Sequence, residues 1–189
     1  VLAKAAQLPS EAHIFEQAQS GKLRIASTHA LSFMFMPRWL RELESQRTPG
    51  QIQLVSDVLP RCEALLIARQ VQFLLTHTLP NTQGVLDAQH YPSLVVGRDV
   101  LLPVASASTQ GEAAHGLTGA SVQTPLKLLS YSPESGIGGM VAQLQHAMMT
   151  AVPTHTVFTA HLASVLRTMA LDGRGMAWLP QTLIADDLA

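Results

Sequence analysis

The sequence predicts an α/β protein, in which short strands alternate with amphipathic helices, and three observations favour this fold class. Residues 22–44 read as a strand, a polar turn and a helix, which form the first half of a βα unit. Similar apolar segments follow along the chain and are separated by Gly, Pro and Ser breaks. Hydrophobic residues make up 47% of the 189, which is enough to bury a sizeable core in one domain or two small lobes.

The first unit ends its strand on polar side chains. Residues 23–26 form the short apolar strand, and Ser27, Thr28 and His29 follow it. In residues 33–43 apolar side chains recur at steps of three and four, so they share one face of a helix. Ligands in open α/β sheets lie beyond the carboxyl ends of the strands, where helices also present unpaired N–H groups. These three polar residues therefore stand where a small polar or anionic ligand would be held.

A second polar turn follows the third predicted strand. Residues 71–75 form this strand, and Thr76, His77 and Thr78 come directly after it. Because parallel strands deliver their carboxyl ends to the same edge of a sheet, we expect this turn to lie at the same edge as the first one.

The remaining elements continue the alternation, and Pro37 predicts a kink in the first helix. We expect further strands over residues 51–56, 94–96, 100–105, 126–131, 155–159 and 175–179. We expect further helices over residues 60–69, 136–149 and 162–173, and a last short helix that opens at Pro180. Gly173 should end the third of these helices as a left-handed cap.

Charge and cysteine content exclude several classes of protein. Only 13% of the residues are charged and the formal net charge is −1, so the chain has no global attraction for nucleic acid or an anionic membrane. Its apolar runs fall short of the roughly 18 residues that a membrane span needs, and its start lacks the pattern of a signal peptide. Cys62 is the only cysteine, so an internal disulfide is impossible, and we expect a buried, small apolar side chain there. These features favour the cytoplasm.

The sequence offers no catalytic or cofactor motif. It contains no GxSxG, P-loop, HExxH or CxxC pattern. Its eight histidines show no metal-ligand spacing, and His155 and His161 are six residues apart across a strand and a helix start. Asp186 and Asp187 close a terminal helix and read as solvated. We therefore expect no enzyme, no metal site and no cofactor.

Three segments resemble the effector-binding domain of LysR-type transcriptional regulators. The first is LRIA, a polar turn and an apolar helix containing MPRWL, over residues 23–40. The second is MALDGRGMAWLP, residues 169–180, which has the family's helix, glycine pair, apolar strand and proline. The third, YSPESGIGG at residues 131–139, together with the tail of the chain, resembles the hypochlorite-responsive branch. The resemblance covers roughly residues 21–189, and it departs from the family at Gln72, where an aspartate is usual.

The resemblance implies a two-lobed fold like that of type II periplasmic binding proteins, with mixed, mostly parallel sheets. Residues 1–20 would be a linker or the end of a linker helix, residues 21–98 lobe I and residues 99–189 lobe II. We expect the family's C-terminal return of the chain to lobe I, and the winged helix-turn-helix of the whole regulator, to be missing.

The resemblance also implies an effector in a cleft between the lobes, with lobe closure or dimer rearrangement as the response. Hydroxyls, imidazoles and helix N-termini suit a small carboxylate or oxyanion. The residues that would line the cleft are Ser27, Thr28, His29, Thr76, His77, Thr78, Tyr131, Ser132, Phe158 and Thr159. The alternative for the serines and threonines is that they cap their helices.

The implied partners are a small-molecule effector, further copies of the chain in a homodimer or tetramer, and DNA only through the absent winged helix-turn-helix domain. We expect no contact with a membrane. A stand-alone solute-binding protein of the same fold is one alternative function. Another is an oxidant sensor, because oxidation to the sulfoxide makes a methionine polar. The seven methionines, which otherwise read as core filler, are Met34, Met36, Met140, Met148, Met149, Met169 and Met176.

Overall fold

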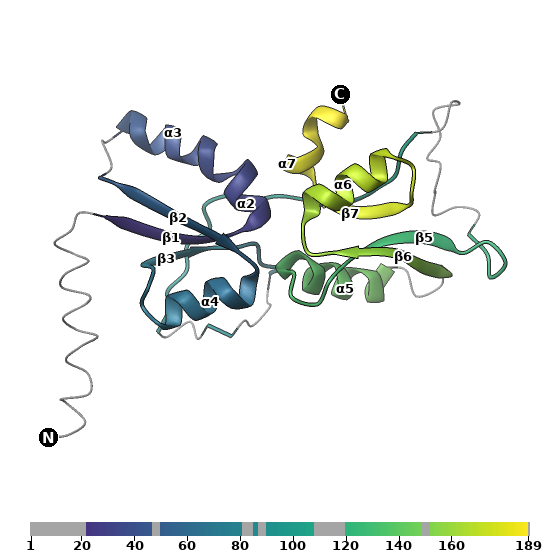
Figure 1. Ribbon diagram of the computed structural model, residues 1–189, viewed down its shortest axis with the longest axis horizontal. Helices are drawn as coiled ribbons and strands as arrows, with labels where there is room; N and C mark the ends of the chain where they lie inside the picture. Colours follow the sequence, from purple (N-terminus) through teal and green to yellow (C-terminus); the bar gives the residue numbers. More distant parts are fainter. Residues whose placement is uncertain are drawn as a thin grey trace, which may run out of the picture. The chain divides into compact units, whose positions relative to one another are not determined.

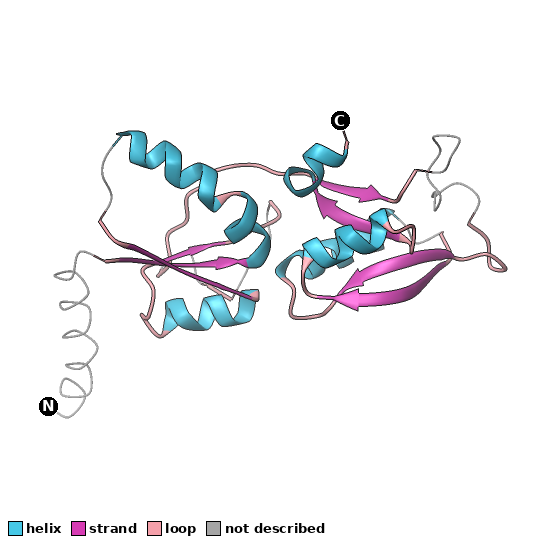
Figure 2. Ribbon diagram, turned by 45° about the horizontal axis from the view of Figure 1, so that its top comes forward, coloured by secondary structure: helices cyan, strands magenta, loops and turns pink. Residues whose placement is uncertain are grey.

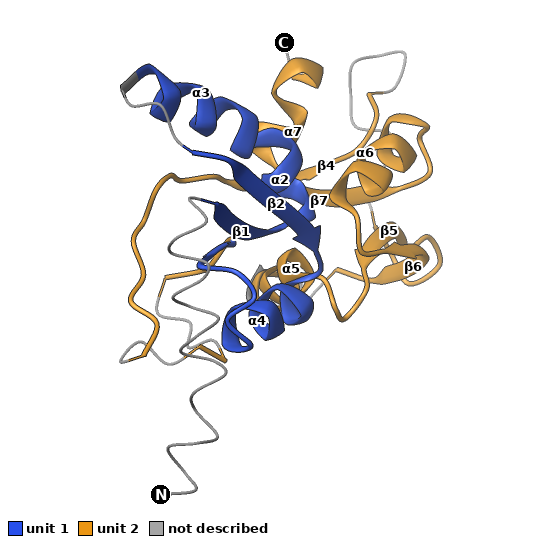
Figure 3. Ribbon diagram, turned by 60° about the vertical axis from the view of Figure 1, so that its left-hand side comes forward, with its two compact units in different colours: residues 1–76 blue, residues 77–189 orange. Residues whose placement is uncertain are grey.

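Two compact units make up the structure. The structure is a computed structural model, and it describes residues 22–46, 50–80, 85–86, 90–107, 120–148 and 152–188. Unit 1 covers residues 1–76 and unit 2 covers residues 77–189 (Figure 3). The predicted linker over residues 1–20 lies outside the described residues. The lobe bounds predicted from the sequence, 21–98 and 99–189, stay a prediction.

Unit 1 is a small parallel sheet with helices on both faces (Figure 1). Its elements are β1 (Leu23–Thr28), α2 (His29–Met34), α3 (Met36–Gln46), β2 (Ile52–Asp57), α4 (Leu59–Ile67) and β3 (Phe73–Leu75). The strands stand in the order β2-β1-β3, so β1 is the central strand. Helix α4 lies on one face of the sheet, and α2 and α3 lie on the other (Figures 1 and 2).

The core of unit 1 lies between the sheet and α4. Its members are the buried Ala26, Cys62 and Val71, against which Leu65, Leu66 and Leu74 pack. Cys62 is fully enclosed, which confirms the prediction for this residue. Burial raises the pKa of its thiol, and the thiol donates weakly, at 3.5 Å, to the carbonyl oxygens of Ser27 and Asp57. Cys62 therefore serves packing rather than thiolate chemistry.

The first helix breaks at Phe35, close to the kink that Pro37 predicted. Helix α2 ends at Met34 and α3 begins at Met36. Phe35 still donates its N–H to the carbonyl of Leu31 at 3.0 Å. Pro37 is the second residue of α3, where a helix needs no N–H donor, so the proline interrupts no hydrogen bond there.

Unit 2 holds a second, mixed sheet. Its elements are β4 (Leu101–Val104), β5 (Leu126–Tyr131), α5 (Gly136–Met148), β6 (Thr154–Ala160), α6 (Ala163–Leu171), β7 (Met176–Pro180), α7 (Gln181–Ile184) and the 3₁₀ helix η1 (Ala185–Asp187). The order is β4-β7-β5-β6, with β4 antiparallel to β7 and the other pairs parallel. This arrangement confirms the predicted α/β fold with mixed, mostly parallel sheets.

Strand β7 and helix α6 form the centre of the core of unit 2. Every residue of β7 is buried. Helix α6 contributes the buried side chains of Ala163, Leu166 and Ala170. Beyond α6, Gly173 has φ +71°, which confirms its predicted role as a left-handed cap.

The two units repeat one strand order. In each unit the first strand of a strand–helix–strand–helix–strand run is central, giving β2-β1-β3 in unit 1 and β6-β5-β7 in unit 2. All pairs within these two triplets are parallel. The carboxyl ends of β1 and β5 are therefore equivalent positions, and each leads into a helix.

The predicted strand over residues 94–96 is wrong. The segment has no regular structure, and Leu94 is 86% exposed. Its three consecutive aliphatic residues resemble a strand, but a strand also needs a neighbour to bond, and the described residues supply none. Within the described part of the chain, no helix is long and apolar enough to cross a membrane.

Candidate functional site

The carboxyl edge of the unit 1 sheet brings polar residues of two strands together. The register pairs Ser27 with Ser56 and Thr28 with Asp57 across β1 and β2. On the other side of β1, the last residue of β3 pairs with Ser27, and Thr76 follows that residue. The two turns that the sequence analysis singled out in unit 1 therefore begin at the same edge of one sheet.

Thr28 holds a buried hydroxyl at this edge. The residue is 9% exposed, and its Oγ1 makes no hydrogen bond within the part of the chain that the structure describes. Thr28 is the N-cap of α2, with φ −65° and ψ 149°, yet its side chain makes no capping hydrogen bond. The capping alternative is therefore wrong for Thr28. A buried hydroxyl without a partner costs roughly 1–3 kcal/mol, so a bound group that hydrogen-bonds to it would be favoured.

Ser27 lies inside unit 1 and fixes the turn. Its side chain is fully enclosed, and its hydroxyl donates to the carbonyl of Thr28 at 3.3 Å. Its own carbonyl accepts from the hydroxyl of Ser32 at 3.3 Å as well as from the Cys62 thiol. The structure thus uses Ser27 to hold the backbone around Thr28.

His29 faces the end of the neighbouring strand. Its Nδ1 lies 2.9 Å from the Oγ of Ser56. Asp57, the next residue, accepts the N–H of Val58 at 2.7 Å, at the start of α4. Sequence reasoning missed Ser56 and Asp57. The rule that selected the end of the first strand would have found them, because β2 is parallel to β1 and also ends in polar residues.

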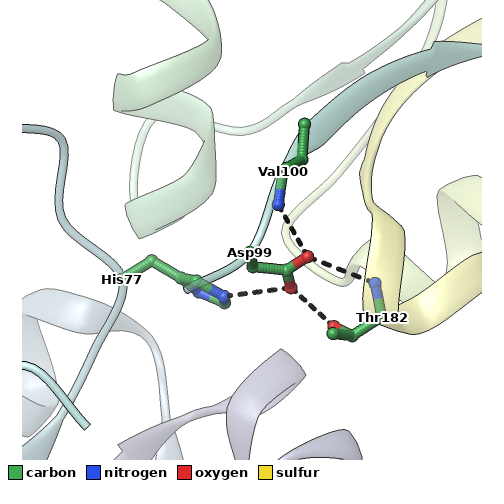
Figure 4. Close-up of polar contacts among 4 residues, drawn as sticks. All are labelled: His77, Asp99, Val100 and Thr182. Carbon is green, nitrogen blue, oxygen red and sulfur yellow. Dashed lines mark hydrogen bonds and ion pairs between the residues drawn. The ribbon is translucent and has the colours of Figure 1, made fainter. Parts of the chain in front are cut away.

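The second predicted turn divides between the units. Thr76 is half-buried and ends unit 1, whereas His77 and Thr78 belong to unit 2. The Nε2 of His77 lies 3.7 Å from the Oδ2 of Asp99, another residue of unit 2 (Figure 4). The exposed Thr78 donates its hydroxyl to the carbonyl of Leu79 at 3.3 Å.

At the equivalent edge of unit 2 some polar groups are hydrogen-bonded within the fold, whereas the buried hydroxyl of Ser132 makes no hydrogen bond among the described residues. Tyr131 ends β5, and its hydroxyl donates to the carbonyl of Trp178 at 3.0 Å. Burial raises the pKa of Tyr131 far above its ordinary value, so the phenol stays neutral. The N–H of Ser132 donates to the carbonyl of Ala160 at 3.0 Å, which ties the turn to the end of β6.

Helix α5 starts against this turn. The Oγ of Ser135 accepts the N–H of Gly138 at 3.3 Å, which caps the helix. A Cβ at Gly138 would lie 2.8 Å from the Cβ of Tyr131, so only glycine fits there. Its own backbone N–H lowers the pKa of the exposed Glu134. A carboxylate therefore lies beside each of the two edges, Glu134 in unit 2 and Asp57 in unit 1.

Phe158 and Thr159 lie within β6 rather than at its end. The strand continues to Ala160, one residue beyond the predicted end. Phe158 pairs with Leu129 and is half-buried, whereas Thr159 pairs with Ser130 and is exposed. Among the described residues, no group of three or more His, Cys, Asp or Glu side chains could hold a metal ion.

Known proteins match the chain along most of its length. The family model described as the LysR substrate binding domain matches residues 16–189. The HTH domain-truncated transcriptional regulator QseD of Escherichia coli O157:H7 is 25% identical over 169 residues, covering 88% of this chain. The chain spans 64% of that relative's length, just under two thirds.

Two solved structures share the fold. The regulatory domain of HypT from Salmonella typhimurium, in its bromide ion-bound form, has a TM-score of 0.70 at 22% identity, covering 88% of this chain and 74% of that chain. The full-length structure of HypT from Salmonella typhimurium, described as a hypochlorite-specific LysR-type transcriptional regulator, has a TM-score of 0.73 at 21% identity. That match covers 98% of this chain and 60% of the other. Because the family model matches most of the sequence, the protein belongs to the LysR substrate-binding domain family.

Proposed function

We propose that this chain is the ligand-sensing part of a LysR-type transcriptional regulator and that it binds a small polar or anionic effector at the carboxyl edge of the unit 1 sheet. The observation that carries the proposal is the buried Thr28 hydroxyl, which makes no hydrogen bond within the described residues. The Thr76 hydroxyl and the His29 imidazole belong to turns at the same edge. In the two-lobed arrangement that the family implies, this edge would face the cleft between the lobes.

The chemistry of the edge favours an anion or a hydrogen-bond acceptor. Hydroxyl groups and imidazoles donate hydrogen bonds, and helices that follow the strands of a parallel sheet start with backbone N–H groups turned toward a ligand. The negative side chain in this part of unit 1 is Asp57, which already accepts the N–H of Val58. A relative's regulatory domain is described as bromide ion-bound, so bromide is a suitable first probe.

Thermal unfolding with added salts tests the effector proposal. Sodium bromide, sodium nitrate and sodium acetate would each be compared at equal ionic strength. At a ligand concentration of about ten times Kd, binding adds roughly 1.4 kcal/mol, which corresponds to a rise in Tm of about 3–5 °C. Thr28→Val and Thr76→Val should abolish the rise. The control Thr168→Val removes an exposed hydroxyl from α6 and should retain it.

An unchanged rise in Tm in both Thr28→Val and Thr76→Val would refute the proposed site. A rise of the same size with every salt would indicate a general salt effect. If none of the three anions raises the Tm, but a neutral sugar or amino acid raises it in the wild type and not in Thr28→Val or Thr76→Val, the site is retained and the effector class changes.

We further propose that two copies of the chain associate through the helix pair α2–α3. Phe33 is 74% exposed there, Leu43 is also exposed, and Phe35 stacks on Trp39 with ring centroids 6.0 Å apart. Exposed apolar side chains on one helical segment are typical of an interface. Light scattering should give a dimer mass, and Leu43→Glu should give a monomer. The control Val122→Glu, at an exposed position of unit 2, should stay dimeric.

DNA binding and the cytoplasmic location belong to the same proposal. We expect DNA to be bound by a winged helix-turn-helix upstream of this sequence, because a formal net charge of −1 gives the chain no overall attraction for nucleic acid. The relative QseD is named as a regulator truncated in that domain, so reading the upstream coding sequence is the decisive check.

Oxidant sensing is a second candidate, because one similar structure is described as hypochlorite-specific. Among the five methionines whose burial the structure describes, Met36 and Met176 are buried, so within this group oxidation should reach the half-buried Met34, Met140 and Met169 first. Peptide mass mapping after hypochlorite treatment would decide. One methionine that oxidises at least tenfold faster than the others supports sensing, whereas uniformly slow oxidation ends the idea.

A further inference from the structure

The Asp99 carboxylate gathers donors from separate stretches of unit 2 (Figure 4). Its Oδ1 accepts the N–H of Val100 at 2.8 Å and the N–H of Thr182 at 3.2 Å. Its Oδ2 accepts the hydroxyl of Thr182 at 2.5 Å and lies 3.7 Å from the Nε2 of His77. Thr182 is 83 residues away in the sequence. One carboxylate thus holds the segment after β3, the start of β4 and the first turn of α7.

The hydrogen bonds around the Asp99 carboxylate offset the cost of removing its charge from water. The Asp99 side chain is 13% exposed, and burying a charge is costly unless hydrogen bonds replace the lost water. Burial raises the pKa of Asp99, but the hydrogen bonds around the carboxylate outweigh it and lower that pKa to about 2. Asp99 is therefore fully ionised at neutral pH, and its hydrogen bonds are charge-assisted.

Helix α7 depends on this distant carboxylate for its start. Its N-cap residue is Pro180, and no side chain adjacent in sequence caps the helix. Asp99 takes this role, because it accepts the N–H of Thr182 in the first turn, where negative charge is also favoured by the backbone dipoles. The N–H of Gln181 adds a hydrogen bond of 2.8 Å to the carbonyl of Val100. Residues 99–100 therefore fix where α7 begins.

We propose that Asp99 is a coupling anchor, through which the chain segment directly after unit 1 and the start of α7 stabilise each other. His77 is the first residue beyond unit 1, and it shares the Oδ2 of Asp99 with the Thr182 hydroxyl. The two contacts hold one carboxylate in one orientation, so each makes the other easier to form. Because such coupling is reciprocal, loosening either end must loosen the other.

The anchor does not depend on the proposed effector site, but it would couple a change at that site to helix α7. Thr76, at the proposed effector edge, is covalently adjacent to His77. A shift of this turn would therefore change the hold on Asp99 and, through it, on α7. Failure of the effector proposal would leave the anchor standing, because its test uses no ligand.

Amide hydrogen exchange on the 189-residue chain tests the anchor. The readouts are the amide of Thr182 in α7 and the amides of residues 76–78 after β3. His77→Gln should speed exchange at Thr182 by about threefold or more, and Thr182→Val should speed exchange at residues 76–78 by a similar factor. Asp99→Asn should speed exchange at both ends by about tenfold. Thr182→Ser keeps the hydroxyl and should restore the slow exchange at residues 76–78.

Two controls keep the test specific. Thr168→Val removes a hydroxyl that donates to the carbonyl of Ser164 within α6, and it should change exchange at neither end. Amides of the buried strand β5 should exchange at the same rate in all variants, which shows that unit 2 remains folded. If Asp99→Asn does not fold, the exchange rates in His77→Gln and Thr182→Val still test the proposal. The proposal is overturned if His77→Gln loosens only residues 76–78 and Thr182→Val loosens only α7.

Discussion

Unit 1 and unit 2 share a strand order but differ at the last residue of their central strands, although the hydroxyl of Ser132, the residue after that strand in unit 2, is also buried without a hydrogen bond among the described residues. In unit 1 the buried hydroxyl of Thr28 makes no hydrogen bond within the described residues. In unit 2 the hydroxyl of Tyr131 donates to the carbonyl of Trp178, and the N–H of Ser132 donates to Ala160. The repeated topology thus places polar groups at one edge in both units, and side-chain packing decides whether each hydroxyl is hydrogen-bonded within the fold, as that of Tyr131 is, or is not, as for Thr28 and Ser132. We infer that unit 1 keeps the capacity to bind a ligand.

The largest expected effect tests the core of unit 2. Leu166 is fully buried in α6, so Leu166→Ala should lower the free energy of unfolding by about 2–5 kcal/mol. Leu171, in the same helix, is 52% exposed, and Leu171→Ala should change it by less than about 0.5 kcal/mol. Urea unfolding would be followed by fluorescence in a Trp39→Phe background, which leaves Trp178 as the reporter within unit 2. Equal losses in the two variants would contradict the packing of α6.

The next prediction separates two adjacent glycines at the start of α5. Gly138→Ala should cost about 1–3 kcal/mol, because the new Cβ would meet the Cβ of Tyr131 at 2.8 Å. A Cβ at Gly139 would meet nothing within 4 Å, so Gly139→Ala should stabilise the helix by about 0.5–1 kcal/mol. Opposite signs in urea unfolding confirm the close contact between α5 and the β5 turn. A stabilising Gly138→Ala would show that the contact does not exist.

The pH dependence of stability tests the Asp99 carboxylate. Its pKa is lowered from 3.8 to about 2 in the folded chain, so its contribution is fully present above pH 4 and is lost as the pH falls toward 2. After a discount for solvent screening we expect about 1–2 kcal/mol. In urea unfolding curves recorded at a series of pH values, Asp99→Asn should lose less free energy of unfolding between pH 4 and pH 2 than the wild type does. An unchanged loss of stability between pH 4 and pH 2 in Asp99→Asn would reject the assignment.

A smaller effect sharpens the contrast between the units directly. Tyr131→Phe removes the hydroxyl that donates to Trp178 and should cost about 0.5–1.5 kcal/mol. The measurement is the free energy of unfolding at neutral pH, where the phenol is neutral. An unchanged free energy of unfolding would mean that the Tyr131 hydroxyl contributes no more to stability than the Thr28 hydroxyl does.

Local sequence patterns were sufficient for most of the fold. Apolar residues at helical spacing located α3, α5 and α6, and Gly173 marked the end of α6. The wrong strand over residues 94–96 had the same kind of apolar run. A run of this kind reports local preference, whereas a strand exists only when a neighbour bonds to it.

The site was harder to predict because its decisive features depend on partners far away in the sequence. The parallel register predicted that the ends of β1 and β3 meet, but the prediction left out Ser56 and Asp57 at the end of β2, the strand on the other side of β1. Asp99 gave no signal at all, since its main donor, Thr182, lies 83 residues further along the chain. Whether a hydroxyl caps its helix, as Ser135 does, or stays uncommitted, as Thr28 does, follows from side-chain geometry rather than residue type.

The most direct test of this account is the free energy of unfolding of Thr28→Val, measured without ligand. Valine matches threonine in shape and removes only the hydroxyl. Since that hydroxyl is buried without a hydrogen bond in the described structure, we predict no loss of stability and a gain of up to about 1 kcal/mol. A loss of 1 kcal/mol or more, equal to that of Tyr131→Phe, would show that the fold already uses the Thr28 hydroxyl and would contradict the account.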